Sequence, residues 1–132
     1  MAVERPDLDG FRLFRPGSPD VWLVFHGRRH RVASSAVYDA LWSEIDGLVN
    51  FDALEEVAIG PELAGGTCLI RAEGTVFIHL LTTQDGEIRR LFVPTFESLQ
   101  GFGFDEGRVR DLPALAVQGI PAGEDLTAAS AR

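Results

Sequence analysis

The chain has 132 residues, and its 20 acidic and 12 basic residues give a formal net charge of -8. The hydrophobic fraction of 45% and the charged fraction of 24% are typical of globular proteins, which excludes an intrinsically disordered chain. No apolar run approaches the ~18 residues that a membrane-spanning helix needs, and the negative field repels nucleic acid and anionic membranes. We therefore expect neither membrane insertion nor nucleic-acid binding.

The start of the chain, its one cysteine and its polar end give three further expectations. The start, "MAVERPDLDGF", carries acids where a signal peptide needs a basic and then an apolar stretch, so the chain as given is expected to be cytoplasmic. Cys68 lies in the apolar run "TCLI" and reads as a buried thiol. We expect one domain, 1–132, with a frayed polar tail over 127–132.

The first half of the sequence predicts three strands and a short helix. Strands rich in β-branched and aromatic residues are expected over 11–14, 21–25 and 30–33, with a turn at His26-Gly27. Ser34 or Ser35 can cap a helix whose apolar face contains "VY" and "LW". The segment "FDALEEVAI" then reads as a helical turn.

The second half predicts the same succession. Strands are expected over 67–70, 75–81 and 88–93, with a strong hairpin signal at Asp85-Gly86. Pro94 and Thr95 precede a helix that begins with "FESL", and "DLPALAVQGI" reads as a second closing turn.

These features recur in order, which predicts an internal duplication. Laying one stretch over the other places Arg15 on Arg71, Gly27 on Gly86 and Arg31 on Arg90. The expected fold is α+β: two tandem repeats, about 10–64 and 65–126, each a short antiparallel β-meander followed by a short helix. We expect the repeats to pack about a pseudo-twofold axis or to stack.

The stretch "LFRPGSPDVWLVFHGRRHRVASSAVYDAL" resembles a repeat of bacterial, often cell-surface or cell-wall-associated, proteins. The pattern of that repeat is Gly-x-Leu-Ile-Arg, Val-Tyr-Leu, Gly-Lys-Arg-His-Ile-Pro, Thr-Phe-x-Ala-Leu and Ile-Pro-x-Gly. It is matched in the second half by, among others, Gly66, Leu69, Ile70, Arg71, Thr95, Phe96, Leu99, Ile120, Pro121 and Gly123. The resemblance covers nearly the whole chain. It implies a surface or assembly-associated location and carries no established catalytic residues. Many such proteins have an export signal, which we do not expect from the start of the sequence as given.

The arginine clusters at the two hairpins are the candidate binding residues. The arginines that align in the duplication, Arg15 with Arg71 and Arg31 with Arg90, can form salt bridges with acidic residues of the other repeat, because guanidinium suits partly buried ion pairs. Alternatively, the hairpin tips dock a partner that carries carboxylate or phosphate groups, or an acidic face of a second copy. The candidates are Trp22, His26, Arg28, Arg29, Arg31, Arg89 and Arg90.

Few residues could support metal binding or catalysis. "HGRRH" lacks both a third metal ligand and a general-base Glu, so we expect no metal and no cofactor, and we assign no catalytic residue. The sequence favours a non-enzymatic binding or scaffold module that engages a protein partner or itself through exposed hairpin tips. The alternatives are a small hydrolase or isomerase with His79 or His30 and a carboxylate between the repeats, a glycan-binding module with Trp22 or Trp42 as platform, and a component of a phage-like or secretion assembly.

Overall fold

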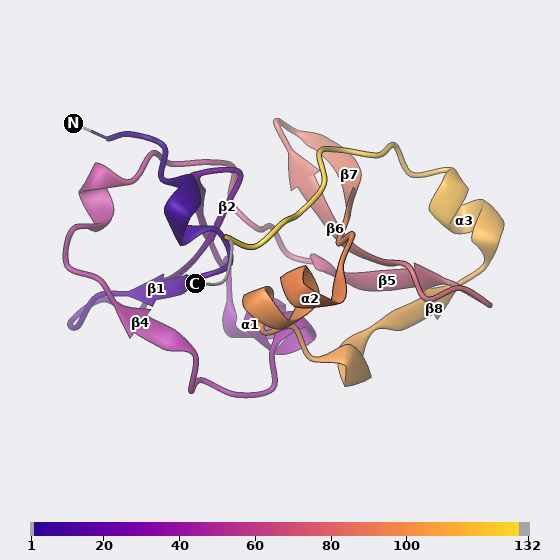
Figure 1. The fold of residues 1–132 in the computed structure, drawn as a ribbon, viewed down its shortest axis with the longest axis horizontal. Coiled ribbons are helices and arrows are strands. Elements are labelled where there is room, and N and C mark those ends of the chain that lie inside the picture. The colour runs from indigo at the N-terminus through magenta and orange to yellow at the C-terminus, as the bar shows by residue number, and fades with distance from the viewer. Residues whose placement is uncertain (1, 130–132) are drawn as a thin grey trace.

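A computed structural model describes residues 2–129 and contains two four-stranded sheets, with strand orders β3-β2-β1-β4 and β7-β6-β5-β8. We call residues 2–64 the first half and residues 65–129 the second half. Helices α1 and α2 lie between the two sheets (Figure 1). The first half contains β1 (Arg12–Phe14), β2 (Val21–Phe25), β3 (Arg28–Arg31), α1 (Ser35–Leu41), β4 (Leu48–Asn50) and the 3-10 helices η1 (Pro6–Leu8) and η2 (Leu54–Glu56). The second half contains β5 (Cys68–Ala72), β6 (Ile78–Gln84), β7 (Glu87–Phe92), α2 (Phe96–Phe102), the 3-10 helix η3 (Glu106–Arg108), β8 (Arg110–Leu112) and α3 (Ala114–Gln118).

Each sheet combines an antiparallel meander with one parallel strand. β1 pairs antiparallel with β2 and β2 with β3, and β5, β6 and β7 pair in the same way. The mixed α+β class predicted from the sequence is confirmed. β4 and β8 were not predicted: each is three residues long, follows a helix, and pairs parallel with β1 or β5. Such short strands have no alternating pattern to reveal them.

The two hairpin turns adopt the conformation that their sequences predict. His26 and Asp85 both have φ of 53°, and the glycines that follow have φ of 77° and 83°. Two successive positive φ values define the type I′ turn, which matches the twist of the flanking strands. β2 and β3 pair over four residues, whereas β6 and β7 pair over six, so the second hairpin extends further beyond its sheet.

Both helices between the sheets begin at the predicted hydroxyl residues. Ser34 Oγ accepts a hydrogen bond from the backbone N–H of Val37 at 3.4 Å, and Thr95 Oγ1 accepts one from Ser98 at 3.0 Å. These caps satisfy backbone donors that the first helical turn leaves unpaired. α2 ends at Gly103, whose φ of 71° suits the left-handed conformation that stops a helix.

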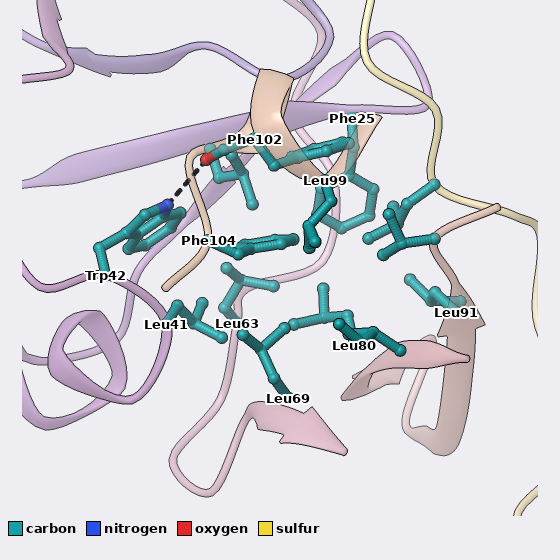
Figure 2. Packing of buried hydrophobic residues seen from close by; sticks show 14 of the residues in the cluster. Phe25, Leu41, Trp42, Leu63, Leu69, Leu80, Leu91, Leu99, Phe102 and Phe104 are labelled. Atoms are coloured by element: carbon teal, nitrogen blue, oxygen red, sulfur yellow. Dashed lines mark hydrogen bonds between the residues drawn. The ribbon is translucent and has the colours of Figure 1, made fainter. Parts of the chain in front are cut away.

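The main hydrophobic core contains side chains from both halves. Trp42 at the end of α1 is buried, and its Nε1 donates to the carbonyl oxygen of Phe102 in α2 at 2.8 Å (Figure 2). The other members of this cluster are Leu23, Phe25, Val32, Val37, Leu41, Leu63, Leu69, Ile78, Leu80, Leu91, Val93, Leu99, Phe104 and Leu126. Aliphatic and aromatic side chains therefore fill the space between the sheets.

The opposite face of each sheet is covered by the segment that ends its half. Leu13 and Val24 of the first sheet pack with Leu54 and Val57, from η2 and the residue after it. In the second half α3 packs against β5. The outer edges of β3 and β7 are also occupied, because Arg29 bridges to Ile59 and Arg90 to Ala122.

The C-terminal segment returns to the first half. The backbone N–H of Ala129 donates to the carbonyl oxygen of Asp9 in the first half at 2.8 Å, and the N–H of Ala128 before it donates to Ser98 Oγ of α2, in the second half, at 3.1 Å. Of the tail predicted to fray, 127–132, residues 130–132 lie outside the described residues. None of the helices in residues 2–129 combines the length and the apolar character that a membrane span requires.

Candidate binding groove

The tip of the first hairpin is enclosed by the chain itself, contrary to the expectation of an exposed tip. The N–H of Gly27 donates to Asp9 Oδ1 at 2.9 Å, and its carbonyl accepts from the N–H of Arg5 at 2.7 Å. His26 Nε2 lies 2.9 Å from the carbonyl oxygen of Asp125. Burial raises the pKa of Asp9, and the hydrogen bond from Gly27 acts in the opposite direction. This tip therefore joins the N-terminal segment to the second half.

One of the candidate residues, Arg29, covers another, Trp22. The guanidinium of Arg29 lies 4.3 Å from the centre of the Trp22 ring, and Arg29 Nε donates to the carbonyl oxygen of Val57 at 3.0 Å. Burial lowers the pKa of Arg29. Arg28 is exposed and pairs with Glu4 at 3.2 Å. Trp22 is thus covered by a cation and packed against the smaller cluster, and does not present a free face.

The remaining arginines also have partners nearby. Arg31 contacts Asp20 at 3.1 Å and Glu62 at 3.2 Å. Arg89 pairs with Glu87 at the second tip, and Arg90 Nε donates to the carbonyl oxygen of Ile120 at 2.7 Å. The other ion pairs of residues 2–129 are Arg5–Asp7, Arg15–Glu55, Arg71–Asp111 and Arg108–Asp105. Every one of these pairs joins two residues of the same half, so the expected salt bridges between the halves are wrong.

The structure also corrects the pairing of Arg31 with Arg90. Arg29 and Arg90 make the same set of bonds: each donates its Nε to a backbone carbonyl, and each exchanges backbone hydrogen bonds with the segment that covers its strand. In the strand ladders, Arg90 therefore occupies the position of Arg29. The alignment of the two halves from their sequences is anchored on the glycine of each hairpin turn. Because the strands of the second hairpin pair over two more residues, that alignment is displaced by two positions.

The three histidines do not form a catalytic cluster. His30 is buried, stacks on Phe25 with ring centres 3.6 Å apart, and has its Nδ1 2.8 Å from the carbonyl oxygen of Pro61. Burial lowers the pKa of His30 to about 4. His79 is buried on the outer face of the second sheet beside Phe92, and burial, then the charge of Arg90, lowers its pKa. His79 Nδ1 has no hydrogen-bond partner within the described part of the chain.

Each half has a groove at the same place in its sheet and helix. The groove of the first half has a volume of about 520 Å³ and lies between the start of β2, the residues after β3, and α1. The Asp20–Arg31 ion pair lies at its edge, Tyr38 lines its wall, and Ile45 is exposed there. Tyr38 is held in place because its hydroxyl donates to the carbonyl oxygen of Glu44 at 2.6 Å.

The groove of the second half, which we call the aromatic groove, has a volume of about 330 Å³ and a different surface. Ile78, Val93 and Leu99 line it and belong to the main core, so its floor is rigid. The side chains at its rim are exposed: Val76 at 80%, Phe77 at 55% and Phe96 at 60%. Its other lining residues are Phe92, Pro94, Thr95 and Glu106.

Corresponding ladder positions carry different chemistry in the two grooves. The backbone N–H of Val32 donates to the carbonyl oxygen of Val21, and that of Val93 donates to the carbonyl oxygen of Ile78. The two pairs therefore occupy equivalent positions in the two ladders, and so do the residues that precede them in the sequence. On that basis Asp20 and Arg31, an ion pair, stand where Phe77 and Phe92 form an edge-to-face pair with ring centres 5.8 Å apart. The first residue of the helix is Ser35 in α1 and Phe96 in α2.

Sequence reasoning did not single out the aromatic groove. The sequence predicts a strand over "TVFIHLL" that includes Phe77, whereas β6 begins one residue after Phe77, and it predicts Phe96 only as the first residue of a helix. The detectable signal was the excess of apolar residues in "TVF" and "PTF" on both sides of the hairpin. Of the large apolar residues exposed in the described structure, only Phe77 and Phe96 are aromatic.

The charges around the aromatic groove are acidic. Glu106 is its only charged lining residue, and Glu97 is exposed next to Phe96. Glu106 acts electrostatically on Arg71, but Arg71 Nε is itself bonded to Asp111 at 2.8 Å.

Comparison with known proteins adds no assignment, because no family model, curated protein or solved structure matches the chain. Among residues 2–129, no group of three or more His, Cys, Asp or Glu side chains is placed to hold a metal ion.

Proposed function

We propose that this chain is a non-enzymatic binding module that engages a protein partner through the aromatic groove. The observation that carries the proposal is the pair of exposed phenylalanines, Phe77 and Phe96, at the rim of a groove with a rigid apolar floor. Exposed apolar patches on globular proteins mark interaction sites, and aromatic side chains in well-packed pockets contribute most of the binding energy at interfaces.

The alternative of a small enzyme has less support. It requires a histidine and a carboxylate that converge in a polar pocket between the halves. The space between the sheets is filled by aliphatic and aromatic side chains of the main core. His30 faces backbone carbonyls, and His79 lies on the outer face of its sheet.

The glycan alternative has less support as well. A sugar-binding platform needs an exposed aromatic face. Trp42 is buried, and the ring of Trp22 is covered by Arg29.

Of the predicted hairpin tips, the second is the exposed one, with residues 85–88 open to solvent and Arg89 paired with Glu87. We treat this tip as a secondary contact region of the same module.

We also propose that the two halves are tandem copies of one ancestral repeat, of the bacterial type that the sequence resembles. The matching strand orders, the N-caps Ser34 and Thr95, and the equivalent bonds of Arg29 and Arg90 support this proposal. In that case the grooves are related sites that have diverged, one keeping an ion pair and the other gaining aromatic side chains. The resemblance also leaves a role within a surface or secretion-type assembly open.

The test is a selection of peptides of about 12 residues from a random library displayed on phage, followed by affinity measurements with purified protein. We expect the enriched peptides to lose about 30-fold in affinity for the Phe77→Ser/Phe96→Ser variant, because an aromatic anchor contributes about 2 kcal/mol. Leu115→Ser is the matched control, since Leu115 is 81% exposed on α3, outside the groove. If no enriched peptide depends on Phe77 and Phe96, the proposal is wrong.

A further inference from the structure

We infer that the segment that fills the aromatic groove is a basic peptide, with an apolar anchor flanked by lysine or arginine. This inference rests on the proposed function and adds the chemistry of the partner. Three features of the groove lead to it: its size, its charges and its contrast with the groove of the first half.

The size of the groove selects side chains rather than a folded surface. Its volume of about 330 Å³ lies at the lower end of the range for small-molecule sites, about 300–1,000 Å³. The buried floor residues Ile78, Val93 and Leu99 present only apolar atoms of their side chains. A single large apolar side chain of an extended segment fits such a site, where it would contact Phe77 and Phe96 at the rim.

The charges at the rim select the residues on either side of that anchor. Glu106 lines the groove, and Glu97 is exposed next to Phe96. Neither carboxylate forms an ion pair within residues 2–129, and Arg71, the base that Glu106 influences, is already paired with Asp111. Two carboxylates without ion-pair partners beside an apolar slot attract cations and repel an acidic segment. The net charge of -8 strengthens the same preference at long range.

The groove of the first half differs in that it contains both the acidic and the basic residue of an ion pair. There the positions of Phe77 and Phe92 hold Asp20 and Arg31, which pair with each other. Arg31 also contacts Glu62, so this site supplies its own cation. The aromatic groove has no basic lining residue, and its acidic rim therefore leaves the cation to the partner.

The experiment uses the best peptide from the selection, synthesised in three versions whose flanking residues are lysine, glutamine or glutamate. We expect affinity for the wild-type protein to fall by about tenfold from the lysine to the glutamine version and further for the glutamate version. Raising the salt concentration from about 0.05 to about 0.5 M is expected to reduce this difference.

Charge variants of the protein separate a local effect from the overall charge. Glu97→Gln/Glu106→Gln is expected to remove most of the preference for lysine. Asp39→Asn/Glu44→Gln removes the same charge at the groove of the first half and is expected to leave the preference intact. If both double variants act alike, the preference reflects net charge and the inference is overturned.

Two further outcomes would contradict the inference in distinguishable ways. Equal binding of all three peptides, with dependence on Phe96 retained, overturns the basic partner but leaves the proposed function standing. Absence of any Phe96-dependent peptide overturns both. Light scattering on the wild type and on Phe96→Ser tests whether a second copy of the chain fills the groove. If the wild type is a dimer and the substitution converts it to a monomer, a second copy is the occupant and the inference fails. Phe96→Ser introduces the residue that α1 has at its first position, Ser35, so we expect the variant to fold.

Discussion

The buried His30 gives the stability of this protein a specific dependence on pH. Its two ring nitrogens face the carbonyl oxygens of Pro61 at 2.8 Å and Phe25 at 3.1 Å. A neutral imidazole can donate to only one of them, so these carbonyls favour the protonated ring. Burial acts in the opposite direction and is the larger effect, and the charges of His26 and Arg28 add to it, which lowers the pKa to about 4.

The size of the effect follows from linkage between protonation and folding. The ordinary pKa of 6.5 applies to the unfolded chain and about 4 to the folded one, so the unfolded chain binds more protons between these values. The free energy of unfolding therefore falls as the pH falls through 6.5 towards 4. With about 1.4 kcal/mol per pH unit at the limit, His30 alone lowers the stability by about 2 kcal/mol between pH 8 and pH 5.

The assay is urea unfolding at pH 8 and pH 5, followed by tryptophan fluorescence, for the wild type and for His30→Leu. Leucine is suitable because Leu91 lies at the corresponding position of β7, and a glycine lies over each side chain: Gly60 over His30 and Gly123 over Leu91. We expect the loss of stability between the two pH values to be about 2 kcal/mol smaller in the variant. His79 remains in both proteins, so its own lowered pKa cancels in the difference.

The comparison depends only on the change with pH, because the substitution also removes two polar contacts and can alter stability at both pH values. If wild type and His30→Leu lose the same free energy between pH 8 and pH 5, the reasoning is refuted. In that case burial would not suppress the protonation of His30.

Three further predictions concern packing, capping and the thiol. Gly60→Ala places a Cβ 2.4 Å from His30 Cε1 and is expected to destabilise the protein by about 1–3 kcal/mol in urea unfolding, whereas Gly65→Ala, with no atom within 4 Å, is expected to have little effect. Thr95→Ala removes the N-cap of α2 and is expected to cost about 1 kcal/mol, while Ser35→Ala, beside the other cap, changes stability much less; equal effects would contradict the assignment. Cys68 is only partly buried, unlike the buried thiol that the sequence predicts, and burial raises its pKa, so its thiol is expected to react with a disulfide reagent at pH 7.5 more slowly than in urea; equal rates would contradict this expectation.

The local elements were largely predictable because local chemistry specifies them. The run of β-branched and aromatic residues predicts β2 at its observed bounds, and the two turns follow from a residue that tolerates positive φ before a glycine. Ser34 and Thr95 identified the helix starts because a hydroxyl there satisfies a backbone donor. β4 and β8 were missed because three residues carry no period, and they become strands only when β1 or β5 lies beside them.

The binding residues were less predictable because their roles depend on contacts between distant segments. "HGRRH" suggested a free basic tip, yet the N-terminal segment covers Gly27, Arg29 covers Trp22, and Glu4 pairs with Arg28. The acids that neutralise this cluster come from elsewhere in the chain, and their positions are not visible in a window of the sequence.

By itself, the sequence determined the α+β class, the two hairpins, the helix starts and the acidic balance, since these depend on side-chain period, turn conformation and composition. Only the tertiary structure decided which apolar and charged residues are satisfied within the fold. Folding buries Trp42 and His30, pairs each arginine cluster within its own half, and leaves Phe77 and Phe96 exposed over the buried core. Exposure and pairing are properties of residues brought together from distant parts of the chain, and a residue type does not carry that information alone.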